Sequence, residues 1–412
     1  MKEDRRIMIL GAGEGQIPLI SRAKREGWKT VVVSPKGDYP GFAIADECRF
    51  YDIADKYAIL ELVKREGITA IATDQTDVSI SSVLFVAKEL GLPSIDCENI
   101  DNFRIKSCMR DTCRDCGLPT IPYCVTDSFD TALSFYQTLP DGLVIIKPVD
   151  SQGSRGVQKI SSKDELSDAF GEARKYSPSK RIILEQFVIG QEIEVDTVIY
   201  DGKVLDTLIG DVHNFEVRNT FSAYIREYPT RLSSADQDRI RNLNAKVVCA
   251  FGLRTGWTHG EYMITADKDV YLLEVGARGG GNFIGSDIVR TMLGVSTDEM
   301  AFDTAIGDLS FYKRVHLRDS YCAYRCFYLP EGEVVSVDIA QDFLQQPFVL
   351  THNLDKLVVG AKTHKNTDKT SRYTIVIKED SREHLQQRLK EIEKSITVRV
   401  RTSSGVQGII WN

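Results

Sequence analysis

The sequence has few residues of the types that build metal or disulfide centres. Six histidines occur in 412 residues, without an HExxH motif or other clustered spacing. The nine cysteines are odd in number and scattered, which indicates free thiols in a reducing compartment. Two pairs, Cys113 with Cys116 and Cys322 with Cys326, lack a second Cys or His pair at zinc spacing, so we interpret them as packing residues.

Long hydrophobic runs and an excess of positive charge are also missing. No apolar stretch approaches the length of a membrane span, and the charged start Met1–Arg6 does not resemble a signal peptide. A net charge of −7 argues against a nucleic-acid or membrane surface as a partner. We therefore expect a cytoplasmic protein in which local cationic side chains meet any anionic cofactor.

The chain does contain an alternation of strand and helix patterns over its first hundred residues. At 412 residues, two or three domains are expected. The alternation predicts a doubly wound α/β domain at the amino terminus. Its predicted elements are the strand Arg6–Leu10, a helix to Glu26, the strand Lys29–Val33, the strand Ile68–Thr73 and a helix through Leu90.

A glycine-containing turn, residues 11–16, follows the first of these strands. Its G-x-G-x-G spacing is a weak form of the dinucleotide fingerprint, and Ser34-Pro35 stands where an acidic ribose ligand would be expected. A nicotinamide oxidoreductase would rest on this turn alone. We favour a turn that closes the fold or helps to hold substrate.

A predicted hairpin near residues 260–275 carries the most informative charges. Symmetric pairing about its polar turn predicts the opposed pairs Thr265 with Val270, Met263 with Leu272, and Glu261 with Glu274. Two carboxylates about 4.5–5.5 Å apart would destabilise the sheet unless something offsets their repulsion. A shared proton or a neighbouring Lys or Arg would do so, and so would a divalent cation completed by phosphate oxygens and water. Arg278 follows in a glycine-rich loop.

Two further segments upstream are suited to a nucleotide. The loop of residues 150–156 follows Lys147 and could fold its backbone over phosphates, although it is not a Walker A loop and could be an ordinary hairpin turn. Acidic residues at 192, 194 and 196 alternate with apolar ones on one strand face. That face could be solvated, or it could offer acceptors to a ribose hydroxyl or an adenine amino group.

The ordered set of these motifs resembles the ATP-grasp superfamily of carboxylate-amine ligases, from the amino terminus to about Asp308. The resemblance implies two phosphate-binding lysines, a loop closing over the phosphates, an adenine hinge, paired magnesium ligands and an arginine that steadies the transferred phosphate. Glu185 and the backbone of Val188 would contact adenine, and Glu192 the ribose. The implied catalytic residues are Lys147 and Arg278; the nucleotide-binding residues are Lys106, Lys147, Ser151, Gly153, Ser154, Gly156, Glu185, Gln186, Phe187, Val188 and Glu192; the metal ligands are Glu261 and Glu274.

The same resemblance implies an α/β and α+β multidomain fold. Its parts would be a Rossmann-like pre-ATP-grasp domain over 1–101, an ATP-grasp domain over 102–309 with a lid at about 120–190, and a small α+β domain over 310–412. One position departs from the Glu-x-Asn-x-Arg pattern, because Gly276 replaces the Asn ligand. Glycine variants of this motif resemble those of amino-acid ligases in the superfamily.

The expected function is an ATP- and Mg²⁺-dependent ligase, with Mn²⁺ as an alternative metal. It would activate a carboxylate as an acylphosphate and couple it to an amine, with an amino acid as a substrate. Its partners would be these small molecules, without nucleic acid or membrane, and a homodimer is the family-based expectation. One alternative is a bicarbonate-using carboxylase or carbamoyl-phosphate-forming subunit. Another is a non-catalytic nucleotide-binding sensor, which would not require Glu261, Glu274 and Arg278.

Overall fold

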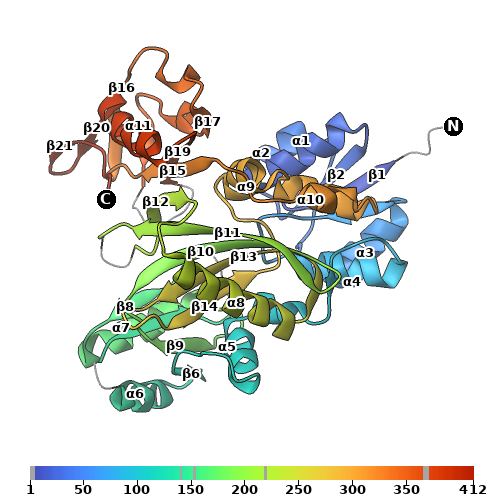
Figure 1. The fold of residues 1–412 in the computed structure, drawn as a ribbon, viewed down its shortest axis with the longest axis horizontal. Helices are drawn as coiled ribbons and strands as arrows, with labels where there is room; N and C mark the ends of the chain where they lie inside the picture. The colour runs from blue at the N-terminus through green and yellow to red at the C-terminus, as the bar shows by residue number, and fades with distance from the viewer. Residues whose placement is uncertain (1–4, 140–141, 152–154, 218–219, 365–370) are drawn as a thin grey trace.

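The computed structural model describes residues 5–139, 142–151, 155–217, 220–364 and 371–412 of the chain. A long, curved central sheet carries the helical amino-terminal part and the carboxy-terminal part on one side in Figure 1, and a smaller sheet with two helices on the other. No helix among the described residues is both long and apolar enough to cross a membrane.

The amino-terminal segment forms the predicted doubly wound unit. Its four strands are all parallel, in the order β3-β2-β1-β4. The inner strands are Val- and Ile-rich and almost wholly buried, as expected where helices cover both faces of a parallel sheet. The elements are β1 (Arg6–Leu10), α1 (Ile17–Arg25), β2 (Lys29–Ser34), α2 (Pro40–Ile44), β3 (Glu47–Phe50), α3 (Lys56–Arg65), β4 (Ala70–Ala72) and α4 (Ile80–Leu90).

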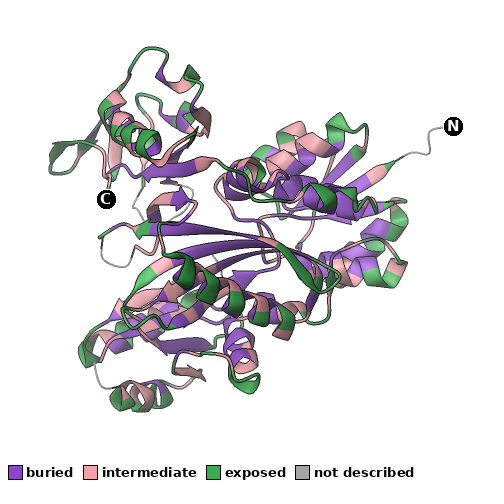
Figure 2. Ribbon diagram, viewed as in Figure 1, coloured by how far each residue is buried: buried purple, intermediate pink, exposed green. Residues whose placement is uncertain are grey.

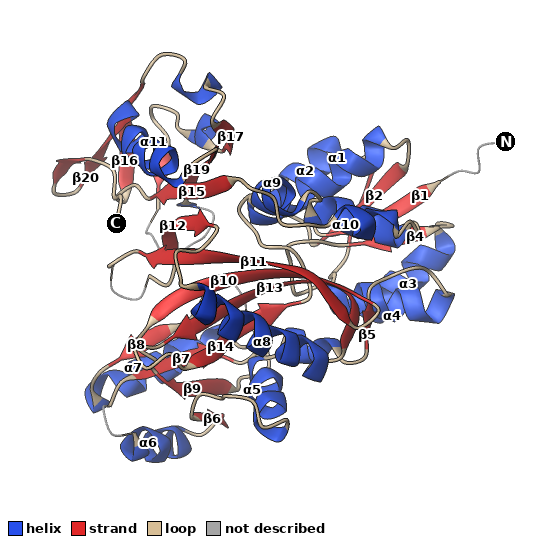
Figure 3. Ribbon diagram, in the orientation of Figure 1, coloured by secondary structure: helices blue, strands red, loops and turns tan. Residues whose placement is uncertain are grey.

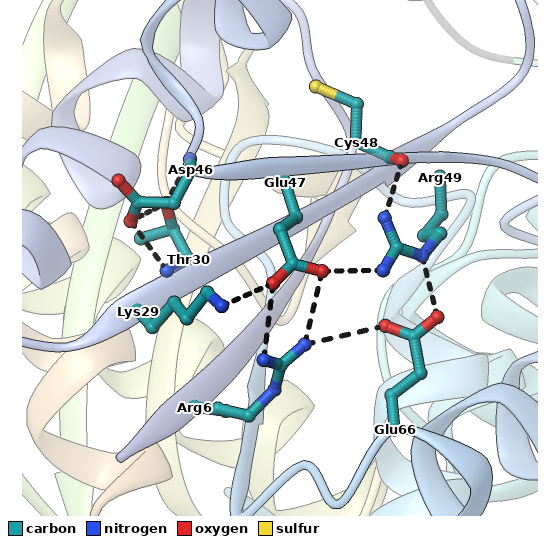
Figure 4. A network of polar contacts seen from close by, with 8 residues as sticks. All are labelled: Arg6, Lys29, Thr30, Asp46, Glu47, Cys48, Arg49 and Glu66. Carbon is teal, nitrogen blue, oxygen red and sulfur yellow. Dashed lines mark hydrogen bonds and ion pairs between the residues drawn. The ribbon is translucent and has the colours of Figure 1, made fainter. Parts of the chain in front are cut away.

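A charge network joins the amino ends of these strands (Figure 4). The Glu47 carboxylate accepts two hydrogen bonds of 3.2 Å from Arg6 and lies 2.6 Å from Lys29 Nζ. Arg49 bridges Glu47 and Glu66 at 2.5 and 2.6 Å. The hydrogen bonds from Lys29 and Arg6 lower the pKa of Glu47 to about 2. Because this network lies at the amino ends of the strands, it does not occupy their carboxyl ends.

The central sheet has nine strands and runs from the predicted ATP-grasp segment into the carboxy-terminal segment. Its order is β14-β13-β10-β11-β12-β15-β19-β17, with β5 added beside β13. Figure 2 shows the long middle strands as mostly buried. The strands are β5 (Asp96–Cys97), β10 (Gln191–Tyr200), β11 (Lys203–Asn214), β12 (Ala223–Tyr228), β13 (Leu253–Ile264), β14 (Val270–Gly276), β15 (Tyr321–Phe327), β17 (Val349–His352) and β19 (Tyr373–Glu379).

Helix α8 packs on β11, β13 and β14 of this sheet and α9 on β11 and β15, whereas α10 packs against the amino-terminal unit (Figure 3). The longest, α8, begins after Ser233, whose side chain accepts a hydrogen bond from the Asp236 backbone N–H. A π-helical turn over Ile284–Ile288 precedes α9. The helices are α5 (Lys106–Asp115), α8 (Ser234–Ala250), α9 (Val289–Leu293) and α10 (Thr297–Ala305).

A separate four-stranded antiparallel sheet, of order β6-β9-β7-β8, forms the segment predicted as a lid. It packs its own hydrophobic cluster, which includes Ile146, Leu166 and Leu184. Its elements are β6 (Tyr123–Thr126), α6 (Phe129–Thr138), β7 (Val144–Pro148), β8 (Gln158–Ile160), α7 (Lys163–Tyr176) and β9 (Ile182–Gln186).

The carboxy-terminal segment adds a second antiparallel sheet and one amphipathic helix. The sheet order is β18-β16-β20-β21. Leu385, Leu389 and Ile392 turn one face of the helix into the local core. The elements are β16 (Gly332–Ile339), β18 (Lys362–Thr363), α11 (Arg382–Ser395), β20 (Ile396–Thr402) and β21 (Gly405–Gln407).

Candidate active site

The structure places Glu261 on β13 directly opposite Glu274 on β14, as predicted. The predicted pairs nearer the turn are wrong by one residue. Val270 pairs with Ile264 rather than Thr265, and Leu272 pairs with Tyr262 rather than Met263. A β-bulge in β14 then takes up one extra residue and restores the opposition of the two glutamates.

The bulge has a structural partner in α5. Leu273, the extra residue, accepts a 2.8 Å hydrogen bond at its carbonyl oxygen from Arg110 Nη2. Arg110 is 2% exposed, and its Nε lies 2.7 Å from Glu185 Oε1. The helix that carries Arg110 also carries Lys106 one turn earlier. The bulge is therefore fixed by the same helix that supplies a predicted phosphate ligand.

Each of the two opposed glutamates is already close to a cation. Lys106 Nζ lies 3.2 Å from Glu274 Oε1 and donates a 2.9 Å hydrogen bond to the Ser151 carbonyl. Arg226 Nη2, from β12, lies 3.5 Å from Glu261 Oε1. Both glutamate side chains remain about one-third exposed, at 32% and 34%. A neighbouring cation thus offsets the repulsion, and both carboxylates are still open to a ligand.

Oxygen donors in this arrangement fit a hard divalent cation. Mg²⁺ is bound in proteins through one or two carboxylates, with phosphate oxygens and water in the remaining positions. The two partly exposed glutamates supply the carboxylates, and the nearby Lys106 suits phosphate as a neighbour. Glu261 and Glu274 are therefore residues that could hold such a cation.

Glu185 is buried at the floor of the adjoining cavity rather than open to a ligand. Its carboxylate is 1% exposed and lies 2.7 Å from both Arg110 and Lys147. Burial alone would raise the pKa of Glu185, but the two cations lower it to about 2. Glu185 therefore holds Lys147, and any contact between its side chain and adenine stays a prediction.

A cavity of about 730 Å³ runs between the lid sheet and the central sheet. The predicted hinge residues Gln186, Phe187 and Val188 line it together with Lys147 and Glu192. Met263, two residues after Glu261, and Leu273, directly before Glu274, line its other side. The volume suits a ligand of nucleotide size.

The far wall of the cavity is the segment around His213, Asn214 and Glu216. Asn214 Nδ2 donates a 2.5 Å hydrogen bond to Glu192 Oε2. Burial and the nearby Glu261 carboxylate raise the pKa of Glu192 to about 7. A carboxyl group that is partly protonated near neutral pH can both accept and donate a hydrogen bond.

The other two acids of the alternating strand face lie deeper and are not solvated. Glu194 contacts Arg226 and accepts a 2.5 Å hydrogen bond from the Tyr228 hydroxyl. His259 Nδ1 lies 2.9 Å from Asp196 and 3.4 Å from Glu194. The interpretation of this face as a solvated acidic surface is therefore wrong for Glu194 and Asp196, because both side chains are buried.

Arg278 is held by the amino-terminal segment. Its Nε and Nη2 donate to the two oxygens of Asp77, at 2.9 and 3.2 Å. Asp74 accepts hydrogen bonds of 2.9 Å from the Gly279 backbone and 2.6 Å from Thr297 Oγ1. Both aspartates follow β4, at the carboxyl end of a parallel strand, where ligand sites of such sheets lie.

The predicted phosphate loop is described in part. The Ser151 carbonyl contacts Lys106, whereas Gly153 and Ser154 lie outside the described residues. Gly156 has a φ of +72°, and a Cβ there would approach Tyr176 to 2.9 Å. Glycine is required at that position by both backbone and space.

The glycine turn after β1 closes the fold. The Gly13 N–H donates a 3.0 Å hydrogen bond to Gln16 Oε1, and Gln16 Nε2 donates a 2.7 Å hydrogen bond to the Asp74 carbonyl. The turn's interior is thus filled by a side chain of the protein, which favours the closing role over a dinucleotide site. All nine cysteines are free.

Sequence reasoning missed Arg110, Arg226 and Asp77. Arg110 had a signal, because it lies four residues after Lys106 and so shares its helical face. Asp77 had a weaker one, its place after a parallel strand. Arg226 reaches the site through contacts with Glu194 and Glu261, which lie on other strands of the central sheet, and no local pattern reveals these contacts.

Comparison with known proteins gives one family match, to the ATP-grasp domain over residues 142–287. The formate-dependent phosphoribosylglycinamide formyltransferase of Wolinella succinogenes is 27% identical over 279 residues, which cover 66% of this chain and 70% of that protein. The carbamoyl phosphate synthase large chain of Methanothermobacter thermautotrophicus is 23% identical over 303 residues, and the chain spans only 28% of its length.

Solved structures match nearly the whole chain. An L-amino acid ligase from Bacillus licheniformis superposes with a TM-score of 0.79 at 20% identity, covering 98% of this chain and 100% of that one. The biotin carboxylase domain of a 2-oxoglutarate carboxylase from Hydrogenobacter thermophilus, solved with MgADP and bicarbonate, gives 0.72 at 16% identity, with coverages of 98% and 91%. At these identities the likeness is one of fold.

Proposed function

We propose that this chain, whose residues 142–287 match the ATP-grasp domain as its sequence predicted, is an ATP-dependent ligase that activates a carboxylate and joins it to an amine. One observation carries the proposal. Glu261 and Glu274 face each other in a hairpin whose Met263 and Leu273 line the same cavity as Lys147 and the predicted adenine hinge. Adenine binding alone would need neither glutamate.

The proposed reaction has two steps. A carboxylate oxygen of the first substrate attacks the γ-phosphorus of ATP, which gives an acylphosphate and ADP. The amine then attacks the acyl carbon, phosphate leaves, and the amine proton passes to solvent or base. No nucleophilic side chain is required, since catalysis of phosphoryl transfer rests on positioning and charge neutralisation.

The side chains contribute positioning and charge. Lys106 and Lys147 would neutralise phosphate oxygens, and each is held in place by a carboxylate in the structure. Arg278 would steady the transferred phosphoryl group from its place beside Asp77. A divalent metal held by Glu261 and Glu274 would supply further charge neutralisation at the phosphates.

An amino acid is the proposed substrate class, and the proposed lid at about 120–190 would exclude water from the acylphosphate. The same proposal includes a Mg²⁺ requirement, a cytoplasmic location and a homodimer. It also includes a division into three domains, over residues 1–101, 102–309 and 310–412. Support for the amino acid comes from Gly276 and from the fold shared with the L-amino acid ligase.

A bicarbonate-using enzyme is the second candidate, favoured by the sequence match to carbamoyl phosphate synthase. Both candidates release ADP, so the carboxylate that stimulates release separates them. Stimulation by bicarbonate alone, without any amino acid, would favour this second candidate.

The direct test is ADP release from purified protein with ATP, Mg²⁺ and an amino-acid panel, with products identified by mass spectrometry. We expect at least one pair of amino acids to stimulate release and to yield an amide. Glu274→Gln should lower release by at least 100-fold, whereas Glu172→Gln, on the exposed face of α7, should leave it unchanged. Bound ATP without any stimulated release would favour the sensor instead.

A further inference from the structure

Gly276 has no backbone reason to be glycine. It lies two residues after Glu274 on β14, in the position of the usual Asn ligand, and its φ is outside the left-handed region. Space is the constraint instead. A Cβ built on Gly276 would lie 2.8 Å from Asp77 Oδ1 and 3.2 Å from Arg278 Nε.

The volume of the absent side chain is therefore taken by the Asp77–Arg278 pair. Asp77 is 9% exposed, and its carboxylate is fixed by two hydrogen bonds from Arg278. An oxygen at 2.8 Å from the Cβ position lies about where the amide oxygen of an Asn side chain could reach. The amino-terminal segment thus brings a carboxylate oxygen to the place where the chain lacks a ligand.

Asp77 also belongs to a repeated arrangement around the proposed phosphate site. Three carboxylates each contact a cation: Glu274 contacts Lys106, Glu261 contacts Arg226, and Asp77 contacts Arg278. A bound triphosphate would draw the cations toward its oxygens, and a divalent metal would draw the carboxylates. Arg278, the partner of Asp77, is itself proposed to contact phosphate, so the exchange would free the Asp77 oxygens.

We propose that Asp77 supplies the carboxylate oxygen that replaces the missing Asn ligand at the second metal. The inference rests on the proposed function, because it assumes a nucleotide with two divalent cations. It assigns to the amino-terminal segment a direct part in the metal site. Asp77 then explains why glycine is accepted at 276, since an Asn side chain there would collide with the ligand that replaces it.

Mn²⁺ binding tests this without turnover. Free Mn²⁺ is counted by electron paramagnetic resonance in the presence of a non-hydrolysable ATP analogue. We expect two bound Mn²⁺ per wild-type chain. Asp77→Ala should weaken the affinity for the second Mn²⁺ at least tenfold and leave the affinities for the first Mn²⁺ and for the nucleotide analogue unchanged. Asp77→Asn, which keeps one carbonyl oxygen, should weaken it less. Asp38→Ala, an exposed position of the same segment, should change neither.

Two further variants separate a ligand from a residue that merely positions Arg278. Arg278→Ala should still bind two Mn²⁺ per chain. The double variant Asp77→Ala with Gly276→Asn should recover binding of the second Mn²⁺. Equal loss of the second Mn²⁺ in Asp77→Ala and Arg278→Ala would overturn the proposal, as would two tightly bound Mn²⁺ in Asp77→Ala. Wild-type protein that binds the analogue with no Mn²⁺ would overturn both the proposed function and this inference. Thermal unfolding of each variant checks that it is folded.

Discussion

Glu185 keeps a negative charge in the interior because two cations enclose it. The carboxylate is nearly inaccessible, and Arg110 and Lys147 approach it equally closely. Removing one member of such a group leaves the others as buried, uncompensated charges. At this scale Glu185 acts on the site by holding Lys147 in the cavity wall.

Glu185→Ala is therefore expected to lower the free energy of unfolding by about 3–5 kcal/mol, the usual cost of breaking a buried ion pair. Urea denaturation measures it. Glu172→Ala, which removes a pair exposed at 37% and 71%, should change stability by no more than about 0.5 kcal/mol. Equal effects of the two substitutions would contradict the assigned role of Glu185.

At the scale of elements, the sequence predicted the alternating strands and helices of the amino-terminal segment and the hairpin that carries Glu261 and Glu274. The strands predicted at Arg6–Leu10 and Lys29–Val33 lie within one residue of expectation. Registers could not be predicted as well. The hairpin pairs nearer the turn were wrong because a bulge cannot be read from alternation, whereas the glutamate pair was right because that bulge compensates the shift.

The strand-end network around Glu47 predicts a pH-dependent stability difference. Glu47 has a folded-state pKa of about 2, below its usual value of 4.5. Its contribution is therefore fully present above about pH 4.5 and is lost as pH falls toward 2. Glu47→Gln should destabilise the protein at pH 7 and progressively less at pH 4 and pH 3.

Urea denaturation at these three pH values measures the difference between Glu47→Gln and wild type. The control is Glu61→Gln, whose carboxylate is 71% exposed and should give no pH-dependent difference. A destabilisation by Glu47→Gln that stayed constant from pH 7 to pH 3 would contradict the assigned pKa.

At the scale of the whole molecule, the amino-terminal segment meets the glycine-rich loop that follows β14. Asp74 and Asp77 hold Gly279 and Arg278 from more than 200 residues away in sequence. Such contacts could not be predicted, because nothing local to either segment specifies the other. The opposition of Glu261 and Glu274 was predictable, since both residues lie within one hairpin.

Thr297→Val tests this junction. The change removes the hydroxyl that donates a 2.6 Å hydrogen bond to the buried Asp74 carboxylate. We expect a loss of about 1–3 kcal/mol in the free energy of unfolding, because a buried acceptor loses its donor. ADP release should also fall, since Asp74 positions the Gly279 backbone. Thr131→Val, at an exposed position of α6, is the matched control.

The central claim is that the cavity activates a carboxylate through ATP, and trapping the activated species tests it most directly. Wild-type protein with ATP, Mg²⁺, the stimulating amino acid and hydroxylamine should form a hydroxamate in step with ADP, and Glu274→Gln should form none above background. ATP binding with ADP release but no hydroxamate from any carboxylate, bicarbonate included, would contradict the account.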